Sequence, residues 1–330
     1  MQKTKFIIRY FFTVLLYLFN LLPLQKKNIG KNINVINFHY FLEKDQKPID
    51  PSIEVNIDIF EKQLSILSKK FNIISTKKNL DSFFLEKNNY IKNNKHYLIL
   101  TIDDADYNFL RVLPIIEKFK IKVLLFAPIG FCLPIQDIVG IRSRCLHFSY
   151  LQYQNENLIK NKETLLELFN KFSTYDYEYL NKIYSKLKKN NDSFFVKKNF
   201  LSISDLNKIA KHDLVTVSSH SMSHLPLALL PKKWINWEIK ESLRYIQECG
   251  GNLSLFSYPY GNKNSVNNDV KKCLQLHGVN YAFTTRAKTL KKNSNHFELG
   301  RTFLFNNSHL YYVKATARGA NQIFDQILNR

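Results

Sequence analysis

Two kinds of apolar pattern alternate along the chain. Continuous apolar runs, such as HYLILTI at residues 96–102, are typical of parallel strands that are covered on both faces. Between such runs lie segments with apolar residues at helical spacing, as in residues 56–71, where Phe60, Leu64 and Leu67 share one face. Strands that alternate with helices predict an α/β fold with a parallel sheet, either open or closed into a barrel.

The same pattern predicts most of the other elements. Further strands are expected at residues 34–41, 122–131, 214–219, 253–259, 281–285 and 297–305. Further helices are expected at residues 109–121, 202–212 and 231–251, with Ser202 or Ser204 capping the second of these. Residues 140–200 are rich in Lys, Asn and Tyr without a clean period, and we expect a mostly helical insertion there.

The N-terminal segment is apolar and flanked by basic residues. Residues 10–24 contain no charge, and Lys or Arg occurs on both sides of them. Fifteen residues are short for a bilayer span, and no small-residue cleavage site follows. Residues 1–30 are therefore expected to form a membrane-associating helix, either interfacial or a single anchor, on an uncertain side of the membrane. A helix docked on the protein's own surface and a cleaved signal are the alternatives, and residues 31–330 form the main domain.

Composition restricts the partners more than the fold. The formal net charge is +21, from 48 Lys and Arg against 27 Asp and Glu, which favours anionic lipids or phosphorylated glycans. No Arg-rich or RNA-binding motif is present, so a nucleic-acid partner is not expected. The four cysteines, Cys132, Cys145, Cys249 and Cys273, form no C-x-x-C pair and indicate packed thiols rather than disulfides or a structural zinc site. The sequence leaves the oligomeric state open.

Polar clusters follow three of the expected strands. Asp103 and Asp104 follow the strand at 96–102, His220 and His224 follow the strand at 214–219, and Tyr258 lies at the end of a third. Active sites of α/β barrels lie at this edge, at the carboxyl ends of the strands. If the two histidines lie in a helical first turn, their spacing of four places them on one face, and with one aspartate they match a catalytic zinc or iron site. The second aspartate can then be the base, and the cation relieves the repulsion between the two carboxylates.

These residues also form linked motifs that resemble a known family. TIDDAD at 101–106, SHSMSH at 219–224 and FSYPYG at 256–261 resemble the three motifs of NodB-type polysaccharide deacetylases, carbohydrate esterase family four, in the F-x-Y-P-[YF]-G variant. INFHYF at 36–41 resembles the element that opens many of these domains. The resemblance covers roughly residues 34–305 and implies a distorted (β/α)7 barrel with the helical insertion at about 140–200 and the apolar N-terminal helix.

The resemblance also implies roles for individual residues. Asp103 would be the general base, and one divalent ion would bind Asp104, His220 and His224, zinc first, with cobalt, nickel or iron as alternatives. The residues expected at the substrate and the oxyanion are Tyr258, Pro259, Tyr260 and His39.

Three departures from the family pattern change these expectations. Ala105 stands where the family usually has Gly, so the turn either avoids positive φ or bears a small strain. Ser257 stands where many members have an Arg that pairs with the base, and Arg301 is the candidate replacement, with a surface Arg as the alternative. The family's catalytic-acid His has no clear match; His309 is the first candidate and His296 the second.

The resemblance implies a metal-dependent hydrolase that removes an N-acetyl or related acyl group from an amino sugar. The substrate is expected to be a cell-envelope polysaccharide or its lipid-linked precursor. The alternatives are deformylation of a lipid-linked amino sugar and a degenerate glycan-binding barrel without turnover.

Overall fold

The computed structural model of the protein describes residues 2–19, 21, 32–85, 95–156, 162–190, 198–306 and 309–323. Lys26 and Lys27, which follow the apolar N-terminal segment, lie outside these residues. The chain forms two compact units. The first unit comprises Met1–Ile102, Asn108–Leu124 and Thr285–Arg330, and the second comprises Asp103–Tyr107 and Leu125–Thr284.

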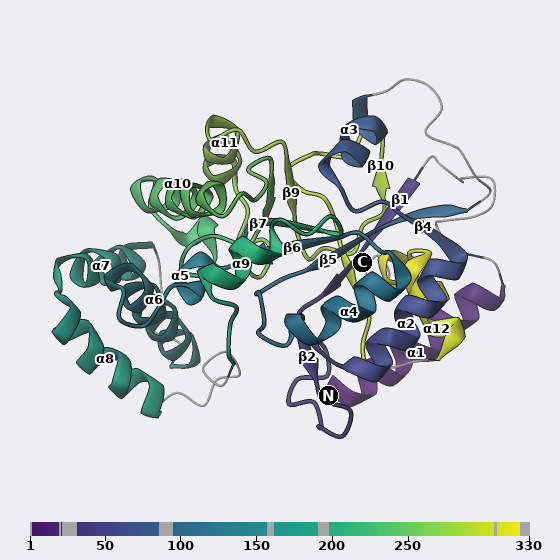
Figure 1. The fold of residues 1–330 in the computed structure, drawn as a ribbon, viewed down its shortest axis with the longest axis horizontal. Helices are drawn as coiled ribbons and strands as arrows, with labels where there is room; N and C mark the ends of the chain where they lie inside the picture. Colours follow the sequence, from purple (N-terminus) through teal and green to yellow (C-terminus); the bar gives the residue numbers. More distant parts are fainter. Residues whose placement is uncertain are drawn as a thin grey trace. The chain divides into compact units, whose positions relative to one another are not determined.

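The first unit is built on a sheet centred on two buried parallel strands, β1 and β5 (Figure 1). Its strands are β1 (Asn32–Phe38), β4 (Phe71–Ile73), β5 (His96–Ile102), β10 (Leu290–Lys291) and β11 (Thr302–Phe303), with β2 (Tyr40–Leu42) and β3 (Glu54–Asn56) as a separate parallel pair. Its helices are α1 (Gln2–Leu18), α2 (Ile57–Lys70), α3 (Lys77–Leu85), α4 (Phe109–Phe119) and α12 (Leu310–Ala317). β4 and β11 run parallel to their neighbours, and β10 is antiparallel. Every residue of β5 is buried, as its continuous apolar sequence predicts.

The second unit continues the alternation of strand and helix. Its strands follow the order β6 (Val123–Ala127, which belongs to this unit from Leu125 onward), β7 (Val215–Ser219), β8 (Leu255–Ser257) and β9 (Tyr281–Phe283). Strands β7, β8 and β9 run parallel. Its helices are α5 (Ile129–Cys132), α6 (Ile138–Asn155), α7 (Lys162–Thr174), α8 (Tyr177–Asn190), α9 (Ile203–Ile209), α10 (Lys232–Glu248) and α11 (Asn268–Leu276). The predicted helicity of residues 140–200 is confirmed by α6, α7 and α8, and both α7 and α8 pack on α6 (Figure 1). All four cysteines are free thiols, as expected.

Two helix caps illustrate how local sequence determines these boundaries. Ser202 caps α9 as predicted, and its side chain and that of Asp205 accept each other's backbone N–H groups in a capping box. Asn56 occupies the N-cap position of α2 but does not cap it with its side chain. Its amide instead donates to the carbonyls of Glu43, Lys44 and Gln46, so it fixes the preceding loop.

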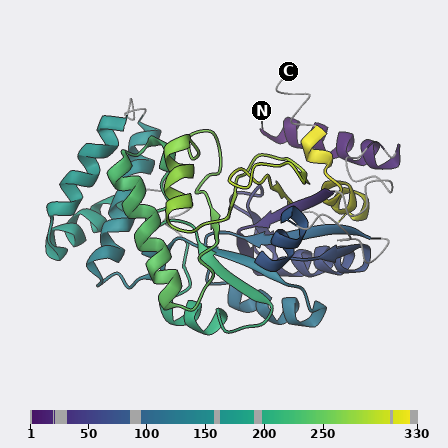
Figure 2. The same cartoon turned by 90° about the horizontal axis from the view of Figure 1, so that it is seen from above.

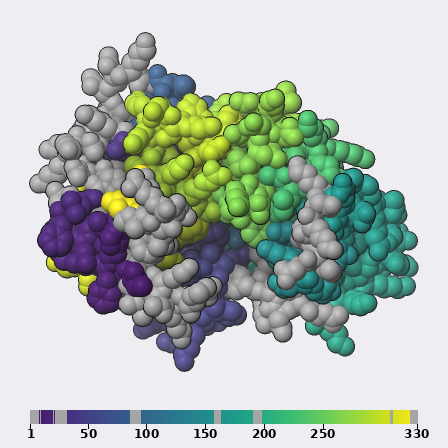
Figure 3. Space-filling model, turned by 180° about the vertical axis from the view of Figure 1, so that it is seen from behind, coloured from purple at the N-terminus to yellow at the C-terminus, as the bar shows by residue number. Residues whose placement is uncertain are grey.

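The apolar N-terminal helix α1 has two different faces. One face packs on α12, where Leu16 joins Ala315 in a small apolar cluster and Tyr10 stacks on Tyr312 at 5.2 Å between ring centroids (Figure 2). The other face presents Ile8, Phe11, Leu15 and Leu18, whose exposed fractions lie between 49% and 62%. Figure 3 shows α1 (purple) at the molecular surface. Within the residues that the structure describes, no helix is both long and apolar enough to cross a membrane.

A candidate metal-dependent active site

The turn that carries the aspartates lies in the second unit and is held by its backbone. Leu201 N–H donates to the Ala105 carbonyl at 2.8 Å, and Tyr107 N–H donates to the Asn199 carbonyl at 3.0 Å. Asp104 and Ala105 both have positive φ, 70° and 50°. Ala105 therefore bears the strain that a Gly would avoid, and such strain is typical of functional turns whose surroundings hold them in place.

The histidines are brought together by a loop and not by a helix. His220 follows β7, where its backbone N–H donates to the Ala127 carbonyl at 2.9 Å. The condition of a helical first turn is not met, because Ser221 and His224 both adopt left-handed conformations with φ of 66° and 52°. These two reversals, rather than helical periodicity, turn the second imidazole back toward the first, and the ring centroids lie 4.9 Å apart.

Asp104, His220 and His224 have the geometry of a ligand set. Asp104 Oδ1 lies 3.4 Å from His220 Nε2 and 3.1 Å from His224 Nε2. Among the residues that the structure describes, these three form a buried group whose potential metal-donor atoms all lie within 4.8 Å of one another. Donors bound to one zinc ion at about 2.0–2.2 Å are separated by similar distances, so these residues fit a divalent ion.

Hydrogen bonding and charge prepare His220 to be a ligand. Its Nδ1 lies 2.7 Å from the Ser257 carbonyl oxygen, to which it donates, so Nε2 carries the lone pair toward Asp104. Burial lowers the pKa of His220, but Asp103 and Asp104 outweigh this effect and raise the pKa above its usual value. The carboxylates therefore favour a positive charge at this point, which a proton or a metal ion supplies.

Asp103 lies beside this trio. Its Oδ2 accepts a hydrogen bond from Ser257 Oγ at 3.3 Å and lies 3.8 Å from His220 Nε2. Ser257 thus contacts the carboxylate with a neutral hydroxyl. Asp106 is also buried, but it pairs through its backbone with Phe200 and lies outside the ligand group.

A buried glutamate supports the histidine loop. Glu238, on α10, accepts hydrogen bonds at Oε2 from the backbone N–H groups of Met222 and Ser223, both at 2.9 Å. Burial raises the pKa of Glu238 to about 7, although these hydrogen bonds lower it. Glu238 therefore ties the residues between His220 and His224 to a helix. The sequence does not single it out, because it is one of three Glu residues in the same helical segment.

The third motif places the ring of Tyr260 against the trio. The Tyr260 ring centroid lies 5.1 Å from that of His224, and Tyr260 has a φ of 61°, immediately before Gly261. Burial raises the pKa of the Tyr260 hydroxyl well above its usual value, so the hydroxyl is neutral. Tyr258 is fully buried and packs edge-on against Phe256. The roles assigned to Tyr258, Pro259 and Tyr260 stay predictions.

A third histidine, which belongs to the helical segment of residues 140–200, also lies next to the site, and the sequence motifs did not predict it. His147, on α6, lies with Nδ1 2.9 Å from the His224 carbonyl oxygen, and the two rings are 5.2 Å apart. Burial, followed by the charge of His224, lowers the pKa of His147 well below its usual value, so its ring is neutral. Residues 140–155 lack a clear period, so nothing in the sequence separates this His from a core histidine.

The remaining candidate residues belong to the first unit. Arg301 is fully buried and donates to Thr101 Oγ1 at 3.2 Å, so the alternative of a surface arginine is wrong. His39 stacks on Phe303 at 5.4 Å. His309 is exposed at the start of α12, with its ring 5.9 Å from that of Tyr10. The pairing of Arg301 with Asp103 and the catalytic roles of His39 and His309 stay predictions.

Comparison with known proteins supports the resemblance seen in the motifs. Residues 160–282 match the family model of polysaccharide deacetylases. This stretch contains His220, His224 and the 256–261 motif, whereas Asp103 and Asp104 lie before it. It begins inside the segment expected as an insertion, so the status of residues 140–200 as an insertion stays a prediction. A search of curated proteins gives no match.

Solved deacetylase structures share the fold. The Streptococcus pyogenes deacetylase PplD, in complex with acetate, superposes with a TM-score of 0.59 at 14% identity, covering 87% of this chain and 98% of that chain. A de-N-acetylase from Aggregatibacter actinomycetemcomitans gives 0.57 at 13% identity, covering 86% and 98%. A polysaccharide deacetylase from Bacillus cereus gives 0.56 at 13% identity, covering 87% and 69%.

The predicted fold class, an α/β barrel of the deacetylase type, is thus confirmed. The family match and the fold together support an enzyme that acts on amide bonds of sugars.

Proposed function

We propose that this protein is a metal-dependent hydrolase that removes an N-acetyl or related acyl group from an amino sugar. The observation that carries the proposal is the buried trio of Asp104, His220 and His224, with the carboxylate of Asp103 beside it. A metal-ligand set with an adjacent carboxylate outside the ligand group is the arrangement that hydrolysis by an activated water requires. The match to polysaccharide deacetylases supports a carbohydrate substrate.

Each residue of the site has one task in this proposal. Asp104, His220 and His224 hold the ion, and Ser257 orients His220 through its carbonyl. A divalent ion in this site, zinc first, supplies a Lewis acid that polarises the amide carbonyl and acidifies water. Asp103 accepts the proton of the attacking water, since its Oδ2 lies 3.8 Å from His220 Nε2.

The third motif completes the acyl site in this proposal. FSYPYG follows the F-x-Y-P-[YF]-G variant, in which Tyr258 and Pro259 shape the acyl pocket. The backbone N–H of Tyr260 donates to the developing oxyanion. The contact of the Tyr260 ring with His224 supports this assignment, because the residue adjoins a member of the ligand set.

The surface properties support a substrate in the cell envelope. The net charge of +21 favours a substrate or lipid that carries phosphate. The exposed apolar face of α1 supports a location at a membrane surface. We therefore propose a polysaccharide of the envelope, or its lipid-linked precursor, as the substrate.

Metal content and hydrolysis test the proposal together. The purified protein is expected to bind one equivalent of zinc and to hydrolyse a soluble chromogenic N-acetyl sugar, and a chelator should abolish the hydrolysis. His220→Ala should lose both properties, whereas His277→Ala, a histidine on the surface of the same unit, should keep both. Full metal stoichiometry in His220→Ala would refute the ligand assignment. Metal binding without turnover of acetyl or formyl substrates would make the protein a glycan-binding barrel.

A further inference from the structure

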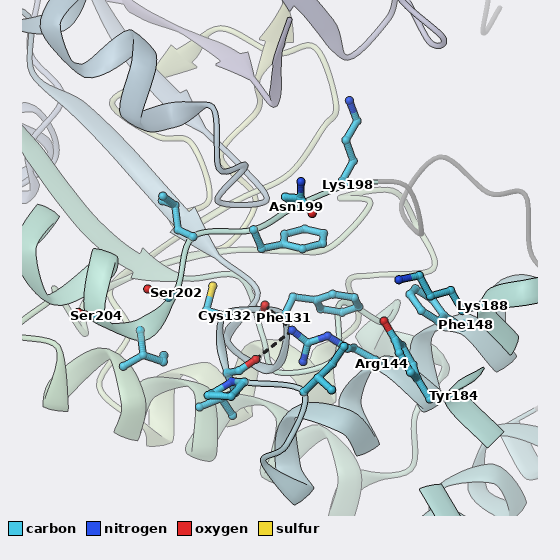
Figure 4. A pocket seen from close by; sticks show the side chains of 16 residues that line it. Phe131, Cys132, Arg144, Phe148, Tyr184, Lys188, Lys198, Asn199, Ser202 and Ser204 are labelled. Carbon is cyan, nitrogen blue, oxygen red and sulfur yellow. Dashed lines mark hydrogen bonds between the residues drawn. The ribbon is translucent and has the colours of Figure 1, made fainter. Parts of the chain in front are cut away.

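A cavity of about 870 Å³ lies within the second unit, apart from the Asp104 trio. Its walls are formed by α5 with the loop after it, by α6 and α8, and by residues 198–204 (Figure 4). The described side chains that line it include Arg144, Lys188 and Lys198 and no carboxylate. The lining therefore carries a net positive charge, unlike the lining of an ordinary apolar pocket.

Arg144 places a buried cation in the wall of this pocket. Only 9% of it is exposed, and its guanidinium donates to the carbonyls of Gly130, Phe131 and Leu133 at 2.7–2.9 Å. It forms no salt bridge with any residue in the part of the chain that the structure describes. Burial lowers the pKa of Arg144, but a guanidinium stays charged. The direct contacts of this buried charge are carbonyl dipoles, and the Asp137 carboxylate acts on it without forming a salt bridge, so an anion nearby is favoured.

Aromatic rings and a lysine complete the lining. The rings of Phe148 and Tyr184 stack at 5.8 Å, and Lys188 Nζ lies 6.0 Å from the Tyr184 ring centroid. Figure 4 shows Lys188 and the Tyr184 hydroxyl on the same side of the pocket as Arg144. Phe131 and Phe200 lie 5.0 Å apart. The negative faces of aromatic rings attract the C–H groups of a sugar ring, and the cations attract its acidic substituent.

The pocket is connected to the metal-ligand trio through its own walls. Phe200 pairs with Asp106, and its neighbour Leu201 donates to Ala105 in the turn that carries Asp104. On the other wall the Phe131 ring lies 5.3 Å from His147, which contacts the His224 carbonyl. The wall of this pocket therefore contacts the turn that carries Asp104 and, through His147, the loop that carries His224.

We propose that this pocket binds an anionic saccharide unit of the substrate, with the sugar ring on the aromatic side chains and a phosphate or carboxylate at Lys188 and Arg144. The identity of the saccharide rests on the proposed function, whereas the anion preference rests on the lining alone. The helical segment α6–α8 thus selects an acidic glycan, or one that carries phosphate, for the adjacent site.

Calorimetric binding to the full chain tests this directly. The probes are N-acetylglucosamine 1-phosphate, glucuronic acid, neutral N-acetylglucosamine and inorganic phosphate. The sugar phosphate or the uronic acid should bind at least about tenfold more tightly than the neutral sugar, as expected for one charge-assisted contact. Whichever of the two binds more tightly identifies the anion as phosphate or carboxylate.

Variants localise the binding to this pocket. Lys188→Ala should weaken binding of the anionic sugar about tenfold and leave turnover of a neutral chromogenic substrate unchanged. Lys189→Ala, an exposed lysine of the same helix that does not line the pocket, should change neither. Phe200→Ala should weaken binding of the sugar anion while leaving inorganic phosphate binding unaltered, because it removes only the ring contact.

The outcomes separate this proposal from the proposed function. Equal affinity for neutral and anionic sugars, or equal loss in Lys188→Ala and Lys189→Ala, would overturn the pocket assignment even in an active enzyme. Conversely, anion-selective binding that depends on Lys188, in a protein that hydrolyses no acyl sugar, would leave the pocket in place and remove the catalytic proposal.

Discussion

Residues with positive φ, which non-glycine residues rarely adopt, are concentrated at the candidate site. Of the described non-glycine residues with positive φ, Asp104, Ala105, Ser221, His224 and Tyr260 lie in the three motifs, and Lys120 is elsewhere. Each such residue costs free energy that the surrounding structure must offset. The motifs predicted which residues gather here, but not that left-handed turns would bring them together. A turn of this kind leaves no period in the sequence, and His220–His224 could be taken for helical spacing.

Asp103 is the residue whose role a single substitution tests most cleanly. Asp103→Asn keeps the size and the hydrogen bond from Ser257, but it removes the basic carboxylate. Turnover should fall by about two to four orders of magnitude, the usual weight of general base catalysis, with metal content and unfolding temperature unchanged. Single-turnover kinetics with metal analysis measure this. Loss of the metal in Asp103→Asn would instead make Asp103 a ligand.

At the scale of elements, the strands with continuous apolar sequence were predictable and the short ones were not. β5 and β7 follow their apolar runs closely, whereas the strand expected at 122–131 ends at Ala127 and is followed by the short helix α5 (Ile129–Cys132). The segment 297–305 was expected to be a regular strand, but only Thr302–Phe303 pair, and Arg301 precedes them. Leu299 and Arg301 are both buried although neither lies in a strand. Tertiary packing, and not strand alternation, therefore directs their side chains inward. β10 has two residues, too few for any periodicity to indicate.

The contact between α10 and the histidine loop predicts a pH effect on stability. The folded state holds the Glu238 proton more tightly, with a pKa of about 7 against an ordinary value of 4.5. The free energy of unfolding should therefore decrease as pH rises from about 4.5 to 7, by up to about 3 kcal/mol from this group. Glu238→Gln keeps an acceptor for Met222 and Ser223 but does not titrate, so its stability should vary less with pH.

Denaturant titrations of the metal-free protein and of Glu238→Gln between pH 4.5 and 8 measure this difference. Other groups titrate in both proteins alike, so only the difference between the two curves reports Glu238. Parallel curves over this range would show that Glu238 is already ionised in the folded protein.

At the scale of the whole molecule, the sequence allowed the N-terminal helix either to associate with a membrane or to dock on the protein's own surface. In the structure one face of the helix docks, and another face remains exposed, as membrane contact requires. α1 docks on α12 through Leu16, and it still exposes an apolar face with Phe11 and Leu15. Hydropathy alone could not separate these faces, because residues 10–24 are apolar almost all round. Deleting α1 would also expose the buried Tyr312 and Ala315, so loss of membrane binding in a truncated protein would be confounded with destabilisation of the first unit.

Point substitutions on the outer face of α1 avoid that confusion. Phe11→Ser combined with Leu15→Ser removes apolar area from the exposed face and leaves the contact with α12 in place. Each large side chain transferred from water contributes about 1.5–3 kcal/mol, so binding to anionic phosphatidylglycerol vesicles should weaken by at least about 100-fold in a sedimentation assay. Leu276→Ser, which changes an exposed leucine of the second unit, is the matched control and should bind like the unmodified protein. Because the net charge is +21, high salt should weaken binding further and neutral phosphatidylcholine vesicles should bind less. If the double variant sediments with anionic vesicles as well as the control does, a different surface binds the lipid.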